Sequence, residues 1–218
     1  AASDVYKRQV NVQGRDLGGF VDEAQKKIAQ EVKLPEGYSL VWGGQFENME
    51  RAMARLMIII PLTIAAIFFL LFMLFQSIRL ASLIILVLPF ASIGGIFGLF
   101  ITGEYLSVPA AVGFINLWGI AVLNGVVLIS FIKQLRDDGM PLHEALIDGC
   151  AHRFRPVMMT ASVAMLALIP MLFSGGPGSE VTRPLAIVVI SGLITSTGLT
   201  LLVLPVLYGW FEDKKVEA

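Results

Sequence analysis

Residues 108–132 read VPAAVGFINLWGIAVLNGVVLISFI, and this stretch contains no Asp, Glu, Lys, Arg or His. A polar and basic link, Lys133–Pro156, follows it, and a second uncharged stretch, Val157–Phe173, comes next. A helix of about 20 apolar residues crosses the ~30 Å hydrocarbon core of a bilayer. These two stretches therefore predict two membrane-spanning helices joined by a polar link.

Three further stretches have the same character, namely Met57–Phe75, Leu80–Ile101 and Leu185–Trp210. Backbone polar groups find no water in hydrocarbon, so each stretch is expected to be helical. The composition agrees, because 56% of the residues are hydrophobic and only 15% are charged. We therefore predict an all-α integral membrane bundle of five transmembrane helices, occupying residues 56–212.

The N-terminal quarter of the chain is different in character. Residues 1–9 are interpreted as a leader of unclear origin. In residues 10–55 the pattern predicts a strand at Val10–Gly14, a helix at Gly18–Val32 and a strand at Tyr38–Trp42. Such a small α/β segment is too short to hold a core alone, so we expect it to be the end of a larger soluble domain.

Lys and Arg in the short loops predict the orientation. If the spans alternate, the basic residues fall on one side, which is expected to be cytoplasmic: Arg79, Lys133, Arg136, Arg153, Arg155, Lys214 and Lys215. The N-terminal segment then lies outside, in the periplasm of a bacterium with two membranes. On the cytoplasmic side, Pro141–Cys150 has the pattern of an amphipathic helix at the membrane surface.

Polar residues inside the spans are expected to form hydrogen bonds between helices, with a place on a transport pathway as the alternative. The candidates are Asn116, Asn124, Ser130, Thr160, Ser162, Ser191, Thr195, Ser196, Thr197 and Thr200. No apolar stretch contains a charged residue or His, yet a proton-driven pump needs titratable groups within the membrane. This chain alone is not expected to supply such a relay.

Small residues in the spans predict close helix packing, with a sliding interface as the alternative. They are Gly94, Gly95, Gly98, Gly113, Gly119, Gly192, Ser196 and Gly198. Four prolines are expected to bend their helices: Pro61, Pro89, Pro170 and Pro205.

From about Val10 to Trp210 the sequence resembles the C-terminal end of the resistance–nodulation–division (RND) efflux pumps, and most closely their heavy-metal, cobalt–zinc–cadmium type branch. Five stretches carry the resemblance: GRDLGGFVDEAQ, LPEGYSLVWGGQFENMERA, VGFINLWGIAVLNGVVLISF, RFRPVMMTASVAMLALIPM and SGGPGSEVTRPLA. Their order and their spacing against five spans make the match specific.

The resemblance implies an inner-membrane, proton-driven exporter of divalent metal cations. It implies a homotrimer with twelve spans per protomer, working with a periplasmic adaptor and an outer-membrane channel. This chain would supply the end of a porter subdomain and spans eight to twelve, whereas the essential carboxylates would lie on the fourth span, in the other half.

The same resemblance implies three pathway residues. Arg153 and Thr160 match the family's arginine and threonine of the eleventh span, and Asn124 is a weaker third. Leu123 occupies the position of the relay lysine of the multidrug branch, and this departure favours the metal branch.

Two other functions stay open: an RND pump for organic amphiphiles, and a membrane scaffold that docks partners in lipid without transporting. No nucleophile–base pair or phosphate loop indicates an enzyme, no cofactor is expected, and the balanced charge does not indicate nucleic-acid binding. His143 and His152, nine positions apart, are a weak metal signal and are interpreted as exposed surface residues.

Overall fold

The computed structural model describes residues 8–10, 12, 17–37, 39–176 and 178–216. The chain divides into two compact units, Ala1–Arg55 and Leu56–Ala218, and each is described by itself. Within the described residues, five helices are long and apolar enough to cross a membrane. The predicted number of spans is therefore confirmed.

The first unit contains helix α1, Leu17–Glu31, where the sequence predicts Gly18–Val32. Val21 is the buried residue of this helix, with 4% of its surface exposed. Glu23 and Lys27 form an ion pair of 2.9 Å on its surface, as expected for opposite charges one helical turn apart.

The described part of the first unit contains no strand. Residues 39–43, which include most of the predicted strand Tyr38–Trp42, have no regular structure, and neither have Val10 and Val12. The other predicted strand residues, Asn11, Gln13, Gly14 and Tyr38, lie outside the described residues. A strand needs a neighbouring strand for its hydrogen bonds, and the described segments of this unit supply none.

The first two spans differ from their predicted limits. Helix α2 runs from Gln45 to Phe75 without a break, so the first membrane helix begins well before Met57. The second span is divided into α3, Ile78–Ile85, and α4, Val87–Thr102. Pro89 explains the break, because it has no N–H to donate to the carbonyl of Ile85, four residues earlier.

Helix α5, Val108–Asp137, begins where the sequence predicts. The Ser107 hydroxyl caps its first turn and accepts a hydrogen bond of 3.4 Å from the Ala110 amide. The preceding turn is closed by Gly103, whose φ of 69° is left-handed and favours glycine.

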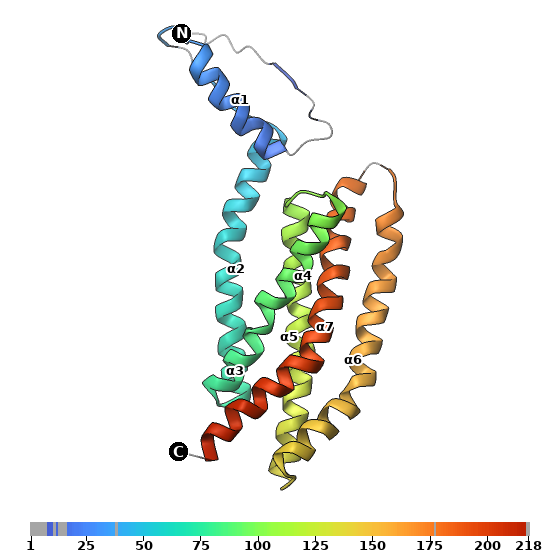
Figure 1. Ribbon diagram of the computed structural model, residues 1–218. Coiled ribbons are helices and arrows are strands. Elements are labelled where there is room, and N and C mark those ends of the chain that lie inside the picture. The colour runs from blue at the N-terminus through green and yellow to red at the C-terminus, as the bar shows by residue number, and fades with distance from the viewer. Residues whose placement is uncertain (1–7, 11, 13–16, 38, 177, 217–218) are drawn as a thin grey trace. The chain divides into compact units, whose positions relative to one another are not determined.

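The predicted surface helix Pro141–Cys150 is helical, but it is not separate from the fourth span. Helix α6 is continuous from Leu142 to Phe173 and includes Pro156. It bends part-way along its length (Figure 1). A proline inside a helix removes one backbone hydrogen bond and bends the axis. Pro156 therefore bends α6, whereas the sequence pattern predicts that the link ends there and a new helix begins.

Helix α7, Ser179–Val216, occupies the centre of the second unit, in contact with α3, α4, α5 and α6. Pro205 deprives the Leu201 carbonyl of its normal partner within the helix. The Cys150 thiol of α6 lies 4.0 Å from this carbonyl and donates to it weakly. A neighbouring helix thus satisfies the group that the proline frees, as membrane helices require.

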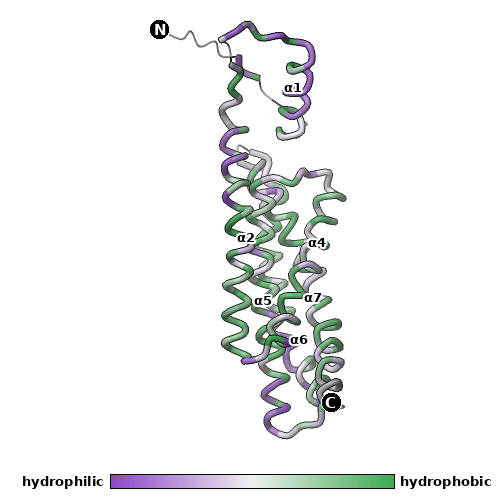
Figure 2. The backbone as a smooth tube through the Cα atoms, turned by 90° about the vertical axis from the view of Figure 1, so that its left-hand side faces the viewer, coloured by the Kyte–Doolittle hydropathy of each residue, from purple (hydrophilic) through white to green (hydrophobic). Residues whose placement is uncertain are grey.

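The hydrophobic core of the second unit gathers around α7. It includes Leu117 and Leu128 of α5, Val188 and Leu193 of α7, and Leu71 near the end of α2. The hydrophobic colour runs along the membrane helices, whereas the link between α5 and α6 is hydrophilic (Figure 2). Much of the apolar surface of α2 and α6 is exposed, as expected of helices that face lipid.

Glycines set the contact between α4 and α7. A Cβ atom at Gly94 would lie 2.6 Å from Thr195 Cβ and 3.0 Å from the Ser191 carbonyl oxygen. At Gly98 it would lie 2.5 Å from Ser191 Cβ. A side chain larger than hydrogen therefore does not fit at these positions, and the predicted close packing holds here.

Two glycines do not take part in such contacts. Gly119 of α5 and Gly198 of α7 are exposed, and a Cβ atom at either would meet nothing within 4 Å. Within the described residues, the packing prediction is wrong for these two, because they lie on faces that no other helix covers.

We predict that Gly94→Ala lowers the free energy of unfolding by about 1–3 kcal/mol, because the added methyl group clashes with the Thr195 side chain and the Ser191 carbonyl of α7. Gly198→Ala is the matched control and should stabilise by up to about 1 kcal/mol through helix propensity. Denaturant titration of both variants in mixed micelles measures this. Equal effects of the two substitutions would show that α4 and α7 do not touch as described.

Candidate functional site

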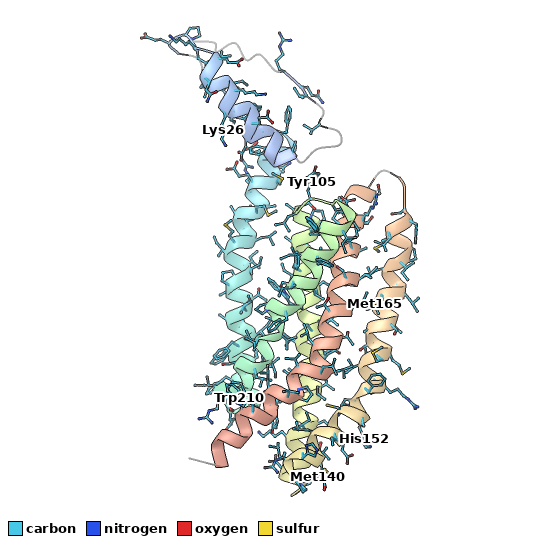
Figure 3. The ribbon with its side chains drawn as sticks, viewed as in Figure 1. Lys26, Tyr105, Met140, His152, Met165 and Trp210 are labelled. Carbon is cyan, nitrogen blue, oxygen red and sulfur yellow. The ribbon has the colours of Figure 1, made fainter. Side chains whose placement is uncertain are left out.

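Arg153 lies near the start of α6, against the end of α5. Its guanidinium carbon is 4.6 Å from the centre of the Phe131 ring, a cation–π contact. The ring of the adjacent His152 lies 5.8 Å from the same Phe131 ring. Figure 3 shows His152 and Met140 at this end of the second unit. The Arg153 Nε atom is buried and has no hydrogen-bond partner among the described residues.

Thr160 lies on α6, two turns beyond Arg153, and its side chain is exposed. Its hydroxyl donates to the Val157 carbonyl of its own helix at 2.9 Å. With Met159, Val163, Ala164 and Ala167 it lines a shallow, open and mostly apolar hollow. Arg153 and Thr160 are seven positions apart in α6, and Pro156 lies between them.

Asn124 is placed differently from these two residues. It is buried in α5, with 6% of its surface exposed, on the side of the helix that contains Leu117, a residue in contact with α7. The structure therefore does not bring Asn124 to the exposed surface where Thr160 lies, and Arg153 packs against Phe131 of α5 whereas Thr160 is exposed.

Four polar side chains of the spans bond within their own helix. Ser191 donates to the Ile187 carbonyl at 2.7 Å, and Thr195 donates to the Ser191 carbonyl at 3.2 Å. Ser196 and Thr160 follow the same pattern. Their hydroxyl protons are therefore donated within the helix rather than between helices, because a carbonyl three or four residues earlier is the nearer acceptor.

A bond between helices forms elsewhere. The Trp118 indole N–H of α5 donates to the Ser92 hydroxyl of α4 at 2.8 Å, and that hydroxyl donates to the Leu88 carbonyl at 2.9 Å. Sequence reasoning missed this pair. A Trp at mid-span, whose N–H must find an acceptor when buried, is the signal that could have found it.

At the opposite end of the second unit, Glu104 Oε1 lies 3.4 Å from Arg183 Nε. This ion pair joins the loop after α4 to the start of α7. Both side chains are partly exposed, so its contribution to stability is modest.

Metal-binding groups are sparse in the part of the chain that the structure describes. There, no three His, Cys, Asp or Glu side chains gather closely enough to hold a metal ion. No residue of the described part is therefore assigned to a metal.

In sequence and in fold, the chain is similar to proteins of one known family. The model of the AcrB/AcrD/AcrF family matches residues 3–212. The chain belongs to this family. It is 51% identical over 208 residues to the cobalt-zinc-cadmium resistance protein CzcA of Cupriavidus metallidurans, covering 95% of this chain and 20% of that protein. To the cation efflux system protein CusA of Escherichia coli it is 37% identical, covering 95% of this chain and 21% of that one.

A solved structure of this family agrees with the fold. A crystal structure of a heavy metal efflux pump superposes with a TM-score of 0.80 at 46% identity, over 92% of this chain and 20% of that chain. The chain thus spans about a fifth of the length of the curated relatives that it matches. The RND resemblance drawn from the sequence motifs is confirmed.

Within this RND family member, Leu123 lies on the outer side of α5 and is 60% exposed. It shares that exposed face with Val112, Asn116 and Gly119, which recur at helical spacing. The described helices leave this face, like the Thr160 face of α6, uncovered.

We predict that Ser92 and Trp118 are energetically coupled. A double-mutant cycle with Ser92→Ala and Trp118→Phe should give a coupling free energy of about 0.6 kcal/mol, and at most about 1.7 kcal/mol. The control cycle pairs Trp118→Phe with Thr102→Ala, whose hydroxyl bonds its own helix, and should give a coupling near zero. The same coupling in both cycles would contradict the bond.

Proposed function

We propose that this chain forms the C-terminal part of a proton-driven RND transporter that exports divalent heavy-metal cations across a bacterial inner membrane. One observation carries the proposal: the 51% identity to a cobalt-zinc-cadmium resistance protein over 95% of this chain. Similar identity to the nickel and cobalt resistance protein CnrA of Cupriavidus metallidurans, 51% over 92% of this chain, supports the same substrate class.

Residues 10–55 are proposed to complete a periplasmic porter subdomain. Their hydrophobic alternation at Tyr38–Trp42 is that of a strand, which would form once a neighbouring strand from a preceding part of the protein pairs with it. The basic loops at the other side of the spans support a periplasmic N-terminal segment.

Arg153 and Thr160 are proposed to face membrane helices that belong to the other half of the transporter. Two observations support this: Thr160 is exposed, and Leu123 is 60% exposed. A carboxylate on a facing helix would give Arg153 a charge-assisted hydrogen bond and would titrate as the proton carrier. Asn124, which is buried on the side of α5 that faces α7, would hold α5 in place against α7.

The proposed assembly follows from the family. The protomers would form a homotrimer in the lipid bilayer, and they would work with a periplasmic adaptor and an outer-membrane channel. Leu123 in place of a relay lysine supports a metal substrate over organic amphiphiles.

Thr160→Val in the full-length transporter should lower cobalt and zinc resistance of a metal-sensitive host severalfold. The substitution keeps the shape of the side chain and removes only the hydroxyl. Thr102→Val is the matched control, because the Thr102 hydroxyl also bonds its own helix, at 2.9 Å, but lies at the end of α4. The control should retain full resistance.

Growth on a panel of metals, dyes and detergents, at equal expression, is the measurement. Unchanged metal resistance in Thr160→Val would remove Thr160 from the pathway. Resistance to dyes and detergents without metals would favour the amphiphile pump. No resistance from the unmodified protein would favour a scaffold.

A further inference from the structure

Helix α2 is held in the second unit near one end only. Among its residues whose burial the structure describes, only Leu71 and Phe75 are buried, each with 4% of its surface exposed. Both belong to the hydrophobic core, and Ile67 and Phe68 pack against it. Farther from that end, α2 lies along no other described helix, because the contacts between helices join α3, α4, α5, α6 and α7 among themselves. The last turns of α2 therefore fix its place in the bundle.

The turn that ends α2 has an unusual backbone. Gln76 has a φ of 50°, in the left-handed region, and its amide donates to the Phe72 carbonyl at 2.8 Å. This region is unfavourable for a residue that has a Cβ atom, and such a residue stays there only where its surroundings hold it. The last carbonyls of a helix also lack partners within the helix. The end of α2 thus needs support from another element.

Lys133 of α5 supplies this support. Its Nζ atom donates to the Phe75 carbonyl at 3.5 Å, across 58 positions of the chain, and the residue is half-buried. A cation near the C-terminal carbonyls of a helix is stabilised by the negative end of the helix dipole. A hydrogen bond from a charged donor is also stronger than one from a neutral donor. One side chain of α5 therefore caps the end of α2.

The two residues before Lys133 contact a different helix. The Phe131 ring packs against the Arg153 guanidinium of α6, and a Cβ atom at Gly149 of α6 would lie 2.5 Å from Ile132 Cγ1. The end of α5 thus holds the start of α6 through Phe131 and Ile132, and the end of α2 through Lys133. The contact with α2 can therefore be removed at one side chain without removing the contacts with α6.

We propose that Lys133 is a positioning residue that clamps the end of α2 to α5. Its ammonium group holds the Phe75 carbonyl and, with it, the left-handed turn at Gln76. Without the ammonium group, the last turn of α2 would open more often, while the contacts between α5 and α6 would remain. This inference concerns how α2 is held, so it does not rest on the proposed transport function.

Hydrogen–deuterium exchange of the full-length protein, measured by mass spectrometry, tests the clamp. Lys133→Met keeps an apolar stem and removes the ammonium group, so the amides of residues 73–76 should exchange about three to ten times faster. Residues 142–153 of α6 should exchange as in the unmodified protein. Lys133→Arg keeps a charged donor and should retain slow exchange at residues 73–76. Arg79→Met is the matched control, because it removes an exposed positive charge from the first turn of α3, and it should leave residues 73–76 unchanged.

Unchanged exchange at residues 73–76 in Lys133→Met, or the same acceleration in Arg79→Met or Lys133→Arg, would overturn the proposal. Acceleration at residues 142–153 as well would show a general loosening of the bundle and would also overturn it. Should Lys133→Met not fold, a cryo-electron microscopy map of the unmodified full-length protein decides. Lys133 Nζ within hydrogen-bond distance of the Phe75 carbonyl would support the clamp, and a Lys133 side chain directed away from α2 would contradict it.

Discussion

The close approach of α4 and α7 is the contact on which the second unit depends. In lipid there is little hydrophobic force between helices, so tight packing at small residues supplies much of the attraction. Gly94 and Gly98 provide it on one side of α7, and Gly192 provides it against Leu117 on another. These glycines therefore set how closely α4 and α5 pack against α7, the helix that also touches α3 and α6.

Helices packed this closely leave little room for polar side chains to reach across. Ser191 and Thr195 accordingly turn back to their own helix. The Trp118 indole, which is long enough to cross, forms the bond between α4 and α5. The uncovered faces of α5 and α6, marked by Leu123 and Thr160, are where the proposed transporter would gain its remaining helices.

Much of this fold could be predicted from the sequence. The absence of charge from long apolar stretches is a strong signal, and it located all five spans. The ends of the spans are harder to predict, because a proline can mark either the end of a helix or a bend within it. The sequence pattern places Pro156 at the end of the polar link, yet α6 continues through it. The strand at Tyr38–Trp42 depends on a partner strand, which no local pattern reveals.

The candidate site was less accessible to sequence reasoning. Arg153, Thr160 and Asn124 were identified by resemblance, but which way each faces depends on how its helix is rotated within the bundle. Arg153 and Thr160 are seven positions apart in the sequence, but Pro156 lies between them, so the spacing alone does not fix their relative directions. The sequence does not predict that Asn124 points into the α5–α7 contact. Leu123 and Asn124 are adjacent, and only the fold decides which of the two is buried.

The most direct test is metal flux in liposomes that contain the purified full-length transporter. We predict that an imposed pH gradient drives zinc or cobalt across the membrane, and that a protonophore abolishes this movement. Metal movement of the same rate with and without the gradient, or none at all, would contradict a proton-driven metal transporter.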